Sequence, residues 1–262
     1  MKTRIRLMSC VAVVVLAASG VAVGALPAGA APTAPTNKYV ALGDSYAAGQ
    51  GGGDYRNVCL QSPNGYPALL DAVKGTNLLR NASCTLATTT DVTDTQLSTL
   101  NRGTTVVTLT VGGNDLNVAG IAAICVSGDS PACSNAINAA AGILYSGQLG
   151  IALAATYAQI DAAAPNAHTI VTGYPYLFEP SATDSLINQL NAATTVLNQT
   201  IQGAVAQAAG AGASIEFVDV SGAFSGHGIG SADPWINMTG SDAFHPTPAG
   251  YAAYAAEIQD AL

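Results

Sequence analysis

The sequence has few charged residues, and basic side chains are the scarcest. Only 9% of the 262 residues are charged, against about 25% in an average soluble domain. The chain has 8 Lys and Arg and 16 Asp and Glu, and its formal charge is −8. With 49% hydrophobic residues, this composition excludes a disordered acidic chain, a collagen and a coiled coil. It also argues against a nucleic-acid-binding protein, because phosphate neutralisation needs clustered Lys and Arg.

The first thirty residues have the layout of a secretory signal peptide. A basic start precedes an almost wholly apolar run from Leu7 to Ala25, and residues 28–30 are small residues in an A-x-A arrangement. We therefore expect cleavage after residue 30, secretion to the extracellular space and a short linker over residues 31–37. The alternative is an uncleaved membrane anchor, because the apolar run approaches spanning length. No other run is long enough, so no stable membrane span is expected after cleavage.

Five cysteines are present, and Cys10 belongs to the expected signal peptide. The other four are Cys59, Cys84, Cys125 and Cys133, an even number in an oxidising compartment, which predicts two disulfides. Three connectivities are possible, and we favour the local one, Cys59 with Cys84 and Cys125 with Cys133. A metal site is the weaker alternative, because no C-x-x-C and no His-rich pattern accompanies these cysteines.

Short apolar runs alternate with helical patterns along the remaining chain. Strands are predicted at 38–42, 105–111, 168–172 and 214–219, where each run ends at or near a turn signal. Helices are predicted at 135–163, 183–209 and 247–262. This alternation predicts an α/β fold, a three-layer α/β/α sandwich with a parallel, flavodoxin-like sheet. Without a second linker or an internal repeat, residues 38–262 are expected to form one domain.

The first predicted strand is followed by Gly43-Asp44-Ser45. A serine between a strand end and a helix start is well placed for a nucleophile, because ligand sites of parallel sheets lie beyond the carboxyl ends of the strands. Free N–H groups at the helix start could also stabilise an oxyanion. The alternative is that Ser45 only caps a helix or closes a turn. The G-x-S-x-G elbow of ordinary α/β-hydrolases is not present, because Ala47 stands at its last position.

The second catalytic candidate follows the run at 105–111 and reads Gly112-Gly113-Asn114-Asp115. The glycines allow the backbone to approach a ligand closely, so Gly113 is a candidate for substrate binding. The Asn114 amide could donate to a developing oxyanion. Alternatively, Asn114 is a turn residue, as asparagine often is.

The third candidate pair, Asp242 and His245, lies near the end of the chain. A serine nucleophile needs a general base to take its proton, and the base works better when a carboxylate holds it in the correct orientation. Asp242 and His245 could supply both groups, although a solvent-facing Asp beside an unrelated His would have the same sequence. His227 is a reserve candidate for the base, whereas His168 opens a predicted strand and is expected to be structural.

Taken together and in this order, the three segments resemble the blocks of the SGNH (GDSL-type) serine hydrolase family, and its secreted actinobacterial lipase and esterase branch in particular. The resemblance covers residues 39–262. It implies that Ser45 attacks an ester carbonyl, that His245 is the general base and that Asp242 orients His245. It also implies an oxyanion hole made of the Ser45 N–H, the Asn114 side chain and a backbone donor from the family's second block.

The second block departs from the family pattern Cys-Ser-Gly-Ala-Thr. This chain has Cys84-Thr85-Leu86-Ala87-Thr88, so Leu86 stands in place of the glycine. Leu86 still has a backbone N–H and is the expected third oxyanion donor. If the position requires positive φ, the leucine side chain is strained there. We expect its side chain to make the wall beside the nucleophile bulkier and more apolar.

The resemblance implies an ester hydrolase without a cofactor or metal, acting on an acyl-ester, lipid-like substrate and expected to be a monomer. We favour a lipase or carboxylesterase for neutral esters, because scarce Lys and Arg offer no evident clamp for an anionic head group. A phospholipase A-type enzyme and a polysaccharide acetylesterase are the next alternatives. An inactive secreted binding module would be expected to have lost one of the three catalytic residues, and all three are present.

Overall fold

The computed structural model describes residues 36–125, 128 and 130–262. The expected signal peptide and residues 31–35 of the expected linker lie outside these residues. Residue 37, the last of that linker, already belongs to the first strand.

Five parallel strands form one sheet in the order β2-β1-β3-β4-β5. The strands are β1 (Asn37–Gly43), β2 (Thr76–Asn81), β3 (Val106–Thr110), β4 (His168–Thr172) and β5 (Ile215–Val218). The four predicted strands are confirmed, with bounds that differ by at most one residue. The edge strand β2 was not predicted, because its polar sequence and its half-exposed residues give no apolar run.

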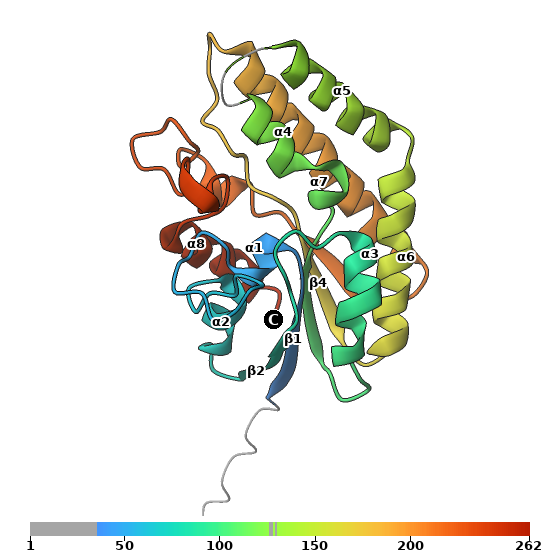
Figure 1. Ribbon diagram of the computed structural model, residues 1–262. Coiled ribbons are helices and arrows are strands. Elements are labelled where there is room, and N and C mark those ends of the chain that lie inside the picture. The colour runs from blue at the N-terminus through green and yellow to red at the C-terminus, as the bar shows by residue number, and fades with distance from the viewer. Residues whose placement is uncertain (1–35, 126–127, 129) are drawn as a thin grey trace, which may run out of the picture. The chain divides into compact units, whose positions relative to one another are not determined.

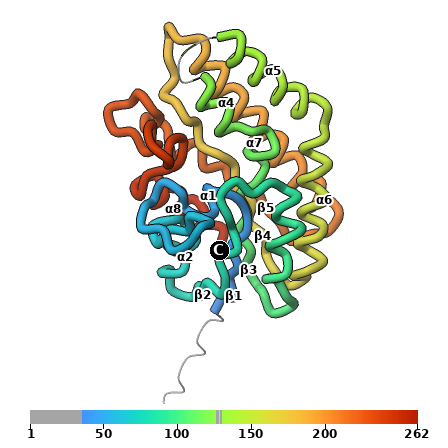
Figure 2. The backbone as a smooth tube through the Cα atoms, in the orientation of Figure 1, coloured from blue at the N-terminus to red at the C-terminus, as the bar shows by residue number. Residues whose placement is uncertain are grey.

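Helices cover both faces of the sheet, which confirms the α/β sandwich. The α-helices are α1 (Ser45–Ala48), α2 (Tyr66–Asp71), α3 (Thr89–Asp91), α4 (Val118–Cys125), α5 (Pro131–Tyr145), α6 (Gln148–Ala163), α7 (Ser185–Gly210) and α8 (Pro248–Gln259). Short 3₁₀ or π turns are η1 (Val92–Gln96), η2 (Leu97–Thr99), η3 (Asn114–Leu116), η4 (Gly222–Phe224) and η5 (Gly240–Asp242). In Figures 1 and 2, α2 and α8 lie on one side of the sheet, and α3, α6 and α7 on the other.

The predicted helix at 135–163 is wrong in both its start and its continuity. The structure has two helices there, because Gly147 adopts φ 76° and interrupts the helical path after α5. The first of them begins at Pro131, earlier than predicted, since the Ser130 side chain accepts a hydrogen bond from the Cys133 N–H and caps it. The predictions for α7 and α8 are confirmed, and their side-chain caps are Asp184 and Thr247.

Two disulfides join Cys59 to Cys84 and Cys125 to Cys133, which are the local pairs that we favoured. The first ties the loop after α1 to the segment after β2, and the second joins α4 to α5. Among the described helices, none alone is long and apolar enough to cross a membrane. The pair α5 and α6 passes that test only when taken together, and the two helices are bent by 56°.

Candidate active site

Ser45 lies at the carboxyl end of β1, at the first position of α1. The chain turns sharply before it, because Gly43 has φ 124° and a Cβ there would lie 2.2 Å from the Thr110 carbonyl oxygen. The Asp44 side chain then caps α1 by accepting a 2.9 Å hydrogen bond from the Tyr46 N–H. Within the described chain no acceptor contacts the Ser45 N–H. Ser45 therefore presents both its hydroxyl and a free N–H at the edge of the sheet.

The structure brings His245 to Ser45 across 200 residues of sequence, with Nε2 of His245 2.8 Å from Oγ of Ser45. Both residues are buried, and both line one cleft. Burial lowers the pKa of His245 below its ordinary value, although the backbone carbonyls of residues 243 and 242 and the Asp242 charge oppose this shift. The imidazole is therefore neutral at pH 7 and can accept the Ser45 proton.

The turn that carries His245 is held by the backbone of Asn237 and by the Tyr46 hydroxyl. Phe244 adopts φ 67°, a conformation that is uncommon for a bulky side chain. Its N–H donates to the Asn237 carbonyl at 2.7 Å, and its carbonyl accepts from the Tyr46 hydroxyl at 2.6 Å. The Asn237 N–H donates to the His245 carbonyl at 2.9 Å. These contacts fix the ring's position, and the sequence analysis assigned no role to Asn237 or Tyr46.

Asp242 does not make the hydrogen bond to His245 that the family pattern implies. Nδ1 of His245 lies 3.0 Å from the backbone carbonyl oxygen of Ala243 instead. Oδ1 of Asp242 is buried and has no hydrogen-bond partner among the described residues. The turn at residues 242–244 thus places a backbone carbonyl, and not the carboxylate, against the ring. Asp242 still acts on the imidazole through its charge, which raises the pKa of His245.

Of the two remaining oxyanion candidates, Asn114 lines the same cleft as Ser45 and His245, whereas Leu86 is not among the residues that line it. Nδ2 of Asn114, in η3, donates a 3.0 Å hydrogen bond to the Ala87 carbonyl, which leaves the second hydrogen of that amide for a ligand. Leu86 has φ 67°, so the position does take the positive φ that glycine would favour. No acceptor in the described chain contacts its N–H. Its side chain is 70% exposed and is not among the residues that line the cleft, so the expected apolar wall is wrong.

Tyr174, which the sequence analysis did not identify, connects two of these segments. Its hydroxyl donates to Oδ2 of Asp44 at 2.5 Å and accepts from the Gly113 N–H at 3.0 Å. Gly113 lines the cleft, but its N–H already donates a hydrogen bond to the Tyr174 hydroxyl and is not free for a substrate. A tyrosine two residues after a strand carries no local signal of such a role. Its position at the carboxyl edge of β4 is the only sequence feature that could have pointed to it.

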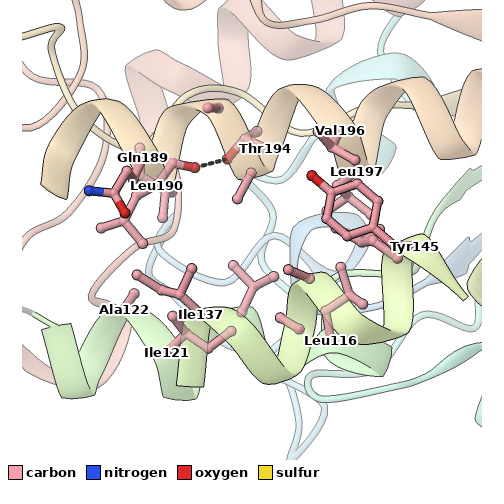
Figure 3. Close-up of a pocket in the computed structure, with 17 residues that line it drawn as sticks. Leu116, Ile121, Ala122, Ile137, Tyr145, Gln189, Leu190, Thr194, Val196 and Leu197 are labelled. Carbon is pink, nitrogen blue, oxygen red and sulfur yellow. Dashed lines mark hydrogen bonds between the residues drawn. The ribbon is translucent and has the colours of Figure 1, made fainter. Parts of the chain in front are cut away.

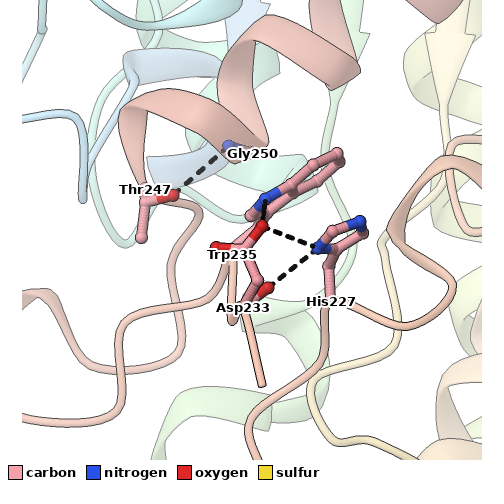
Figure 4. A network of polar contacts seen from close by, with 5 residues as sticks. All are labelled: His227, Asp233, Trp235, Thr247 and Gly250. Atoms are coloured by element: carbon pink, nitrogen blue, oxygen red, sulfur yellow. Dashed lines mark hydrogen bonds and ion pairs between the residues drawn. The ribbon is translucent and has the colours of Figure 1, made fainter. Parts of the chain in front are cut away.

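The two remaining histidines lie in other contacts. Figure 4 shows His227 beside Trp235, on which its ring stacks with a centroid distance of 3.5 Å. Nδ1 of His227 lies 2.8 Å from the Asp233 carbonyl. His168 lies at the start of β4 and contacts Glu216 at 2.7 Å, which agrees with a structural role. Of the three histidines, it is His245 that contacts Ser45.

The chain is similar to known lipases and acylhydrolases. The model of the GDSL-like lipase/acylhydrolase family matches residues 41–253. Lipase 1 of Streptomyces coelicolor is 34% identical over 259 residues, which cover 94% of each chain. The crystal structure of a phospholipase A1 from Streptomyces albidoflavus superposes with a TM-score of 0.79 at 33% identity, over 86% of this chain and 99% of that one. The crystal structure of an extracellular lipase from Streptomyces rimosus superposes with a TM-score of 0.79 at 32% identity, over 87% of this chain and 100% of that one.

Proposed function

The chain belongs to the GDSL-like lipase/acylhydrolase family, whose members are carboxylic ester hydrolases, and we propose that it is a secreted lipase or carboxylesterase with Ser45 as nucleophile. The observation that carries the proposal is the 2.8 Å contact between Nε2 of His245 and Oγ of Ser45. A nucleophile and a base within hydrogen-bond reach are the minimum for serine catalysis. Secretion is supported by the two disulfides and by the extracellular relative from Streptomyces rimosus.

The proposed reaction has two halves. Oγ of Ser45 attacks the ester carbonyl while Nε2 of His245 takes its proton, and collapse of the tetrahedral intermediate breaks the carbon–oxygen ester bond. His245 returns the proton to the leaving alcohol, and an acyl group remains on Ser45. Water then attacks the acyl-enzyme with His245 again as base, so that a carboxylic acid leaves and the hydroxyl is restored.

Charge stabilisation in this mechanism comes from both sides of Ser45. The Ser45 N–H, the Leu86 N–H and the free hydrogen of the Asn114 amide are donors for the oxyanion. On the imidazole side, the Ala243 carbonyl accepts the Nδ1 proton and sets the tautomer, so that Nε2 faces Ser45 as an acceptor. Asp242 completes the triad through its negative charge, which favours the imidazolium that forms during attack.

A phospholipase A-type activity is the second candidate, and the similarity to the Streptomyces albidoflavus phospholipase A1 favours it. Against it, no Lys or Arg is among the residues that line the cleft, so a clamp for a phosphate group is not provided there. We rank neutral acyl esters first on this ground.

A panel of p-nitrophenyl esters, triacylglycerols and phospholipids, assayed with the wild type and Ser45→Ala, tests the proposal. We expect ester hydrolysis by the wild type and a loss of at least about 10³-fold in kcat for the variant, with an unchanged far-UV spectrum. Hydrolysis that persists in Ser45→Ala would refute the role of Ser45. Faster turnover of phospholipids than of neutral esters would favour the second candidate.

A further inference from the structure

Gln50 is a buried residue whose side chain joins separate segments of the active site. Its Nε2 donates a 2.9 Å hydrogen bond to the Ser241 carbonyl, and its Oε1 accepts a 2.7 Å hydrogen bond from the Thr85 hydroxyl. Its backbone N–H donates to the Ser45 carbonyl at 3.0 Å. Because a carbonyl can only accept, Nε2 must face Ser241, and Oε1 is then left for Thr85. The segments of the nucleophile, the base and the Leu86 donor thus meet at one amide.

The contact with Thr85 reaches the turn that carries the Leu86 N–H. In this turn the Ala87 N–H donates to the Cys84 carbonyl at 3.1 Å. The backbone has a negative φ at Thr85 and φ 67° at Leu86, which is the pattern of a type II turn. A type II turn favours glycine at its third position, because a side chain there is crowded at positive φ. Leu86 therefore opposes the conformation of its own backbone.

The turn that a leucine would favour directs the Leu86 N–H elsewhere. In a type I turn the third residue has a negative φ, and the change from type II alters ψ before the central peptide and φ after it by about 150–170° each. That change inverts the peptide between Thr85 and Leu86, so its N–H points to the opposite side. The third donor of the proposed oxyanion hole depends on contacts that keep the strained form.

Packing of the Leu86 side chain does not hold this turn, because the side chain is 70% exposed. The segment of the Asn114 donor is packed differently, since Leu116 is buried and lines an apolar space with side chains of α5 and α7 (Figure 3). The Leu86 turn is held through Thr85, whose N–H donates to the Cys59 carbonyl at 3.1 Å and whose hydroxyl makes the contact described above. Strained backbone persists where surrounding contacts over-determine it in this way.

We propose that Gln50 is a positioning residue, which holds the turn at 84–87 in place relative to Ser45 so that the Leu86 N–H is directed at the oxyanion. The inference rests on the proposed ester hydrolysis at Ser45 and adds a residue that supports its transition state from outside the cleft. Gln50 is not among the residues that line the cleft. Its removal should therefore act on kcat and not on KM, because the oxyanion forms only during the reaction.

The test uses the full chain and p-nitrophenyl butyrate. Thr85→Val removes the hydroxyl and keeps the β-branched shape, Thr85→Ser keeps the hydroxyl, and Gln50→Leu removes both contacts of the amide. Thr200→Val is the matched control, because it removes a half-buried hydroxyl on α7 that donates to the Val196 carbonyl at 2.9 Å. Thermal unfolding checks that each variant keeps the fold.

We expect Thr85→Val to lower kcat about tenfold or more, up to the ~10²–10³ that loss of one oxyanion donor costs, with KM within about twofold of the wild type. Thr85→Ser and Thr200→Val should keep kcat within about twofold. Gln50→Leu should lose at least as much kcat as Thr85→Val. A kcat of Thr85→Val within about twofold of the wild type, or a loss that appears in KM alone, would overturn the proposal.

A trifluoromethyl heptyl ketone reports on the oxyanion directly. Oγ of Ser45 adds to its carbonyl while His245 takes the hydroxyl proton, and the adduct carries the negative oxygen. We expect the inhibition constant in Thr85→Val to rise by a factor similar to the fall in kcat/KM. An unchanged constant beside a reduced kcat would show that the contact does not act on the oxyanion.

The same substitution in a Leu86→Gly background separates support of the strained turn from a general structural effect. Because glycine adopts positive φ without strain, Thr85→Val should lower kcat by less than about threefold relative to Leu86→Gly alone. An equal loss in both backgrounds would overturn the proposal. Hydrolysis that persists in Ser45→Ala would instead refute the proposed function itself.

Discussion

The Tyr174 hydroxyl donates a 2.5 Å hydrogen bond to the Asp44 carboxylate, and both groups are buried. The same hydroxyl accepts a hydrogen bond from the Gly113 N–H. Burial, reinforced by the Asp44 charge, raises the pKa of Tyr174 well above its ordinary value, so the hydroxyl keeps its proton and remains a donor. One side chain after β4 thereby joins the segment that carries Ser45 to the segment that carries Asn114.

Tyr174→Phe removes this connection. The Gly113 N–H and one Asp44 oxygen lose their partner, at a cost of about 1–3 kcal/mol for each buried polar group. We expect the free energy of unfolding to fall by about 2 kcal/mol or more, and kcat to fall more than KM changes, because Asn114 is no longer held relative to Ser45. Denaturant unfolding and steady-state kinetics measure both effects.

Tyr176→Phe is the matched control for this variant. It removes a half-buried hydroxyl that contacts Thr195 at 3.1 Å, and neither residue is among those that line the cleft. A loss of kcat in this control as large as that in Tyr174→Phe would contradict a specific role for Tyr174.

Asp44 should make the protein less stable at neutral pH than at acid pH. Burial raises the pKa of Asp44 to about 7, although hydrogen bonds from Tyr174 and from backbone N–H groups lower it. Because the folded state holds this proton more tightly than the unfolded state, the stabilisation is complete below about pH 4 and is lost as the pH rises to about 7. The amide introduced by Asp44→Asn does not titrate. We therefore expect the Tm of the wild type minus that of Asp44→Asn to be smaller at about pH 8 than at about pH 5. A difference that grows with pH would contradict the raised pKa.

The activity of the enzyme should persist into mildly acid solution. His245 must be neutral to act as a base, and burial lowers its pKa from the ordinary value of 6.5. The acid limb of the kcat/KM profile is therefore expected below this value. A stopped assay of a neutral ester across the acid range measures it. An acid limb above the ordinary histidine value would show that the Asp242 charge and the backbone carbonyls outweigh burial.

Asp242→Asn tests how much the Asp242 carboxylate contributes to the orientation and charge stabilisation of His245. Because Nδ1 of His245 contacts the Ala243 carbonyl, the tautomer should survive the substitution. We expect kcat/KM to fall roughly tenfold, and not by the ~10⁴ seen where a carboxylate holds the tautomer. The acid limb should also move to lower pH, since a negative charge that raises the pKa is lost. A loss of about 10⁴ would restore the direct orienting role that the family pattern implies.

Asn114→Ala removes the side-chain donor of the proposed oxyanion hole. We expect kcat to fall by about 10²–10³ with little change in KM, because this contact forms in the transition state. Asn138→Ala, on the exposed surface of α5, provides a control for the loss of an amide. Near-normal kcat in the first variant would remove Asn114 from the proposed hole.

The sequence predicted those parts of the fold that have a local pattern. β-Branched apolar runs marked four strands, whereas the edge strand β2 is half exposed and polar and has no such pattern. The break between α5 and α6 was missed because an alanine-rich sequence continues on both sides of Gly147. The helix propensity is high on both sides of Gly147, and the positive φ of that one residue ends α5 and separates it from α6.

At the site, Ser45 and His245 could be predicted because motif order identifies them, and the structure places them in contact. The Ala243 carbonyl could not be predicted, because its direction depends on backbone angles around Phe244 that no residue type fixes. Tyr174 was missed for another reason. Its role depends on the approach of segments that are 130 and 61 residues away in sequence.

The hydroxyl of Ser45 and the imidazole of His245 come from nearly opposite ends of the described domain, and α8 contacts the segment after Ser45 through the Tyr251 hydroxyl and the Gln50 carbonyl. During synthesis the hydroxyl leaves the ribosome long before the imidazole exists. A product of translation that stops before His245 lacks the proposed base, and hydrolysis requires that the segment carrying His245 has been made and has packed against Ser45.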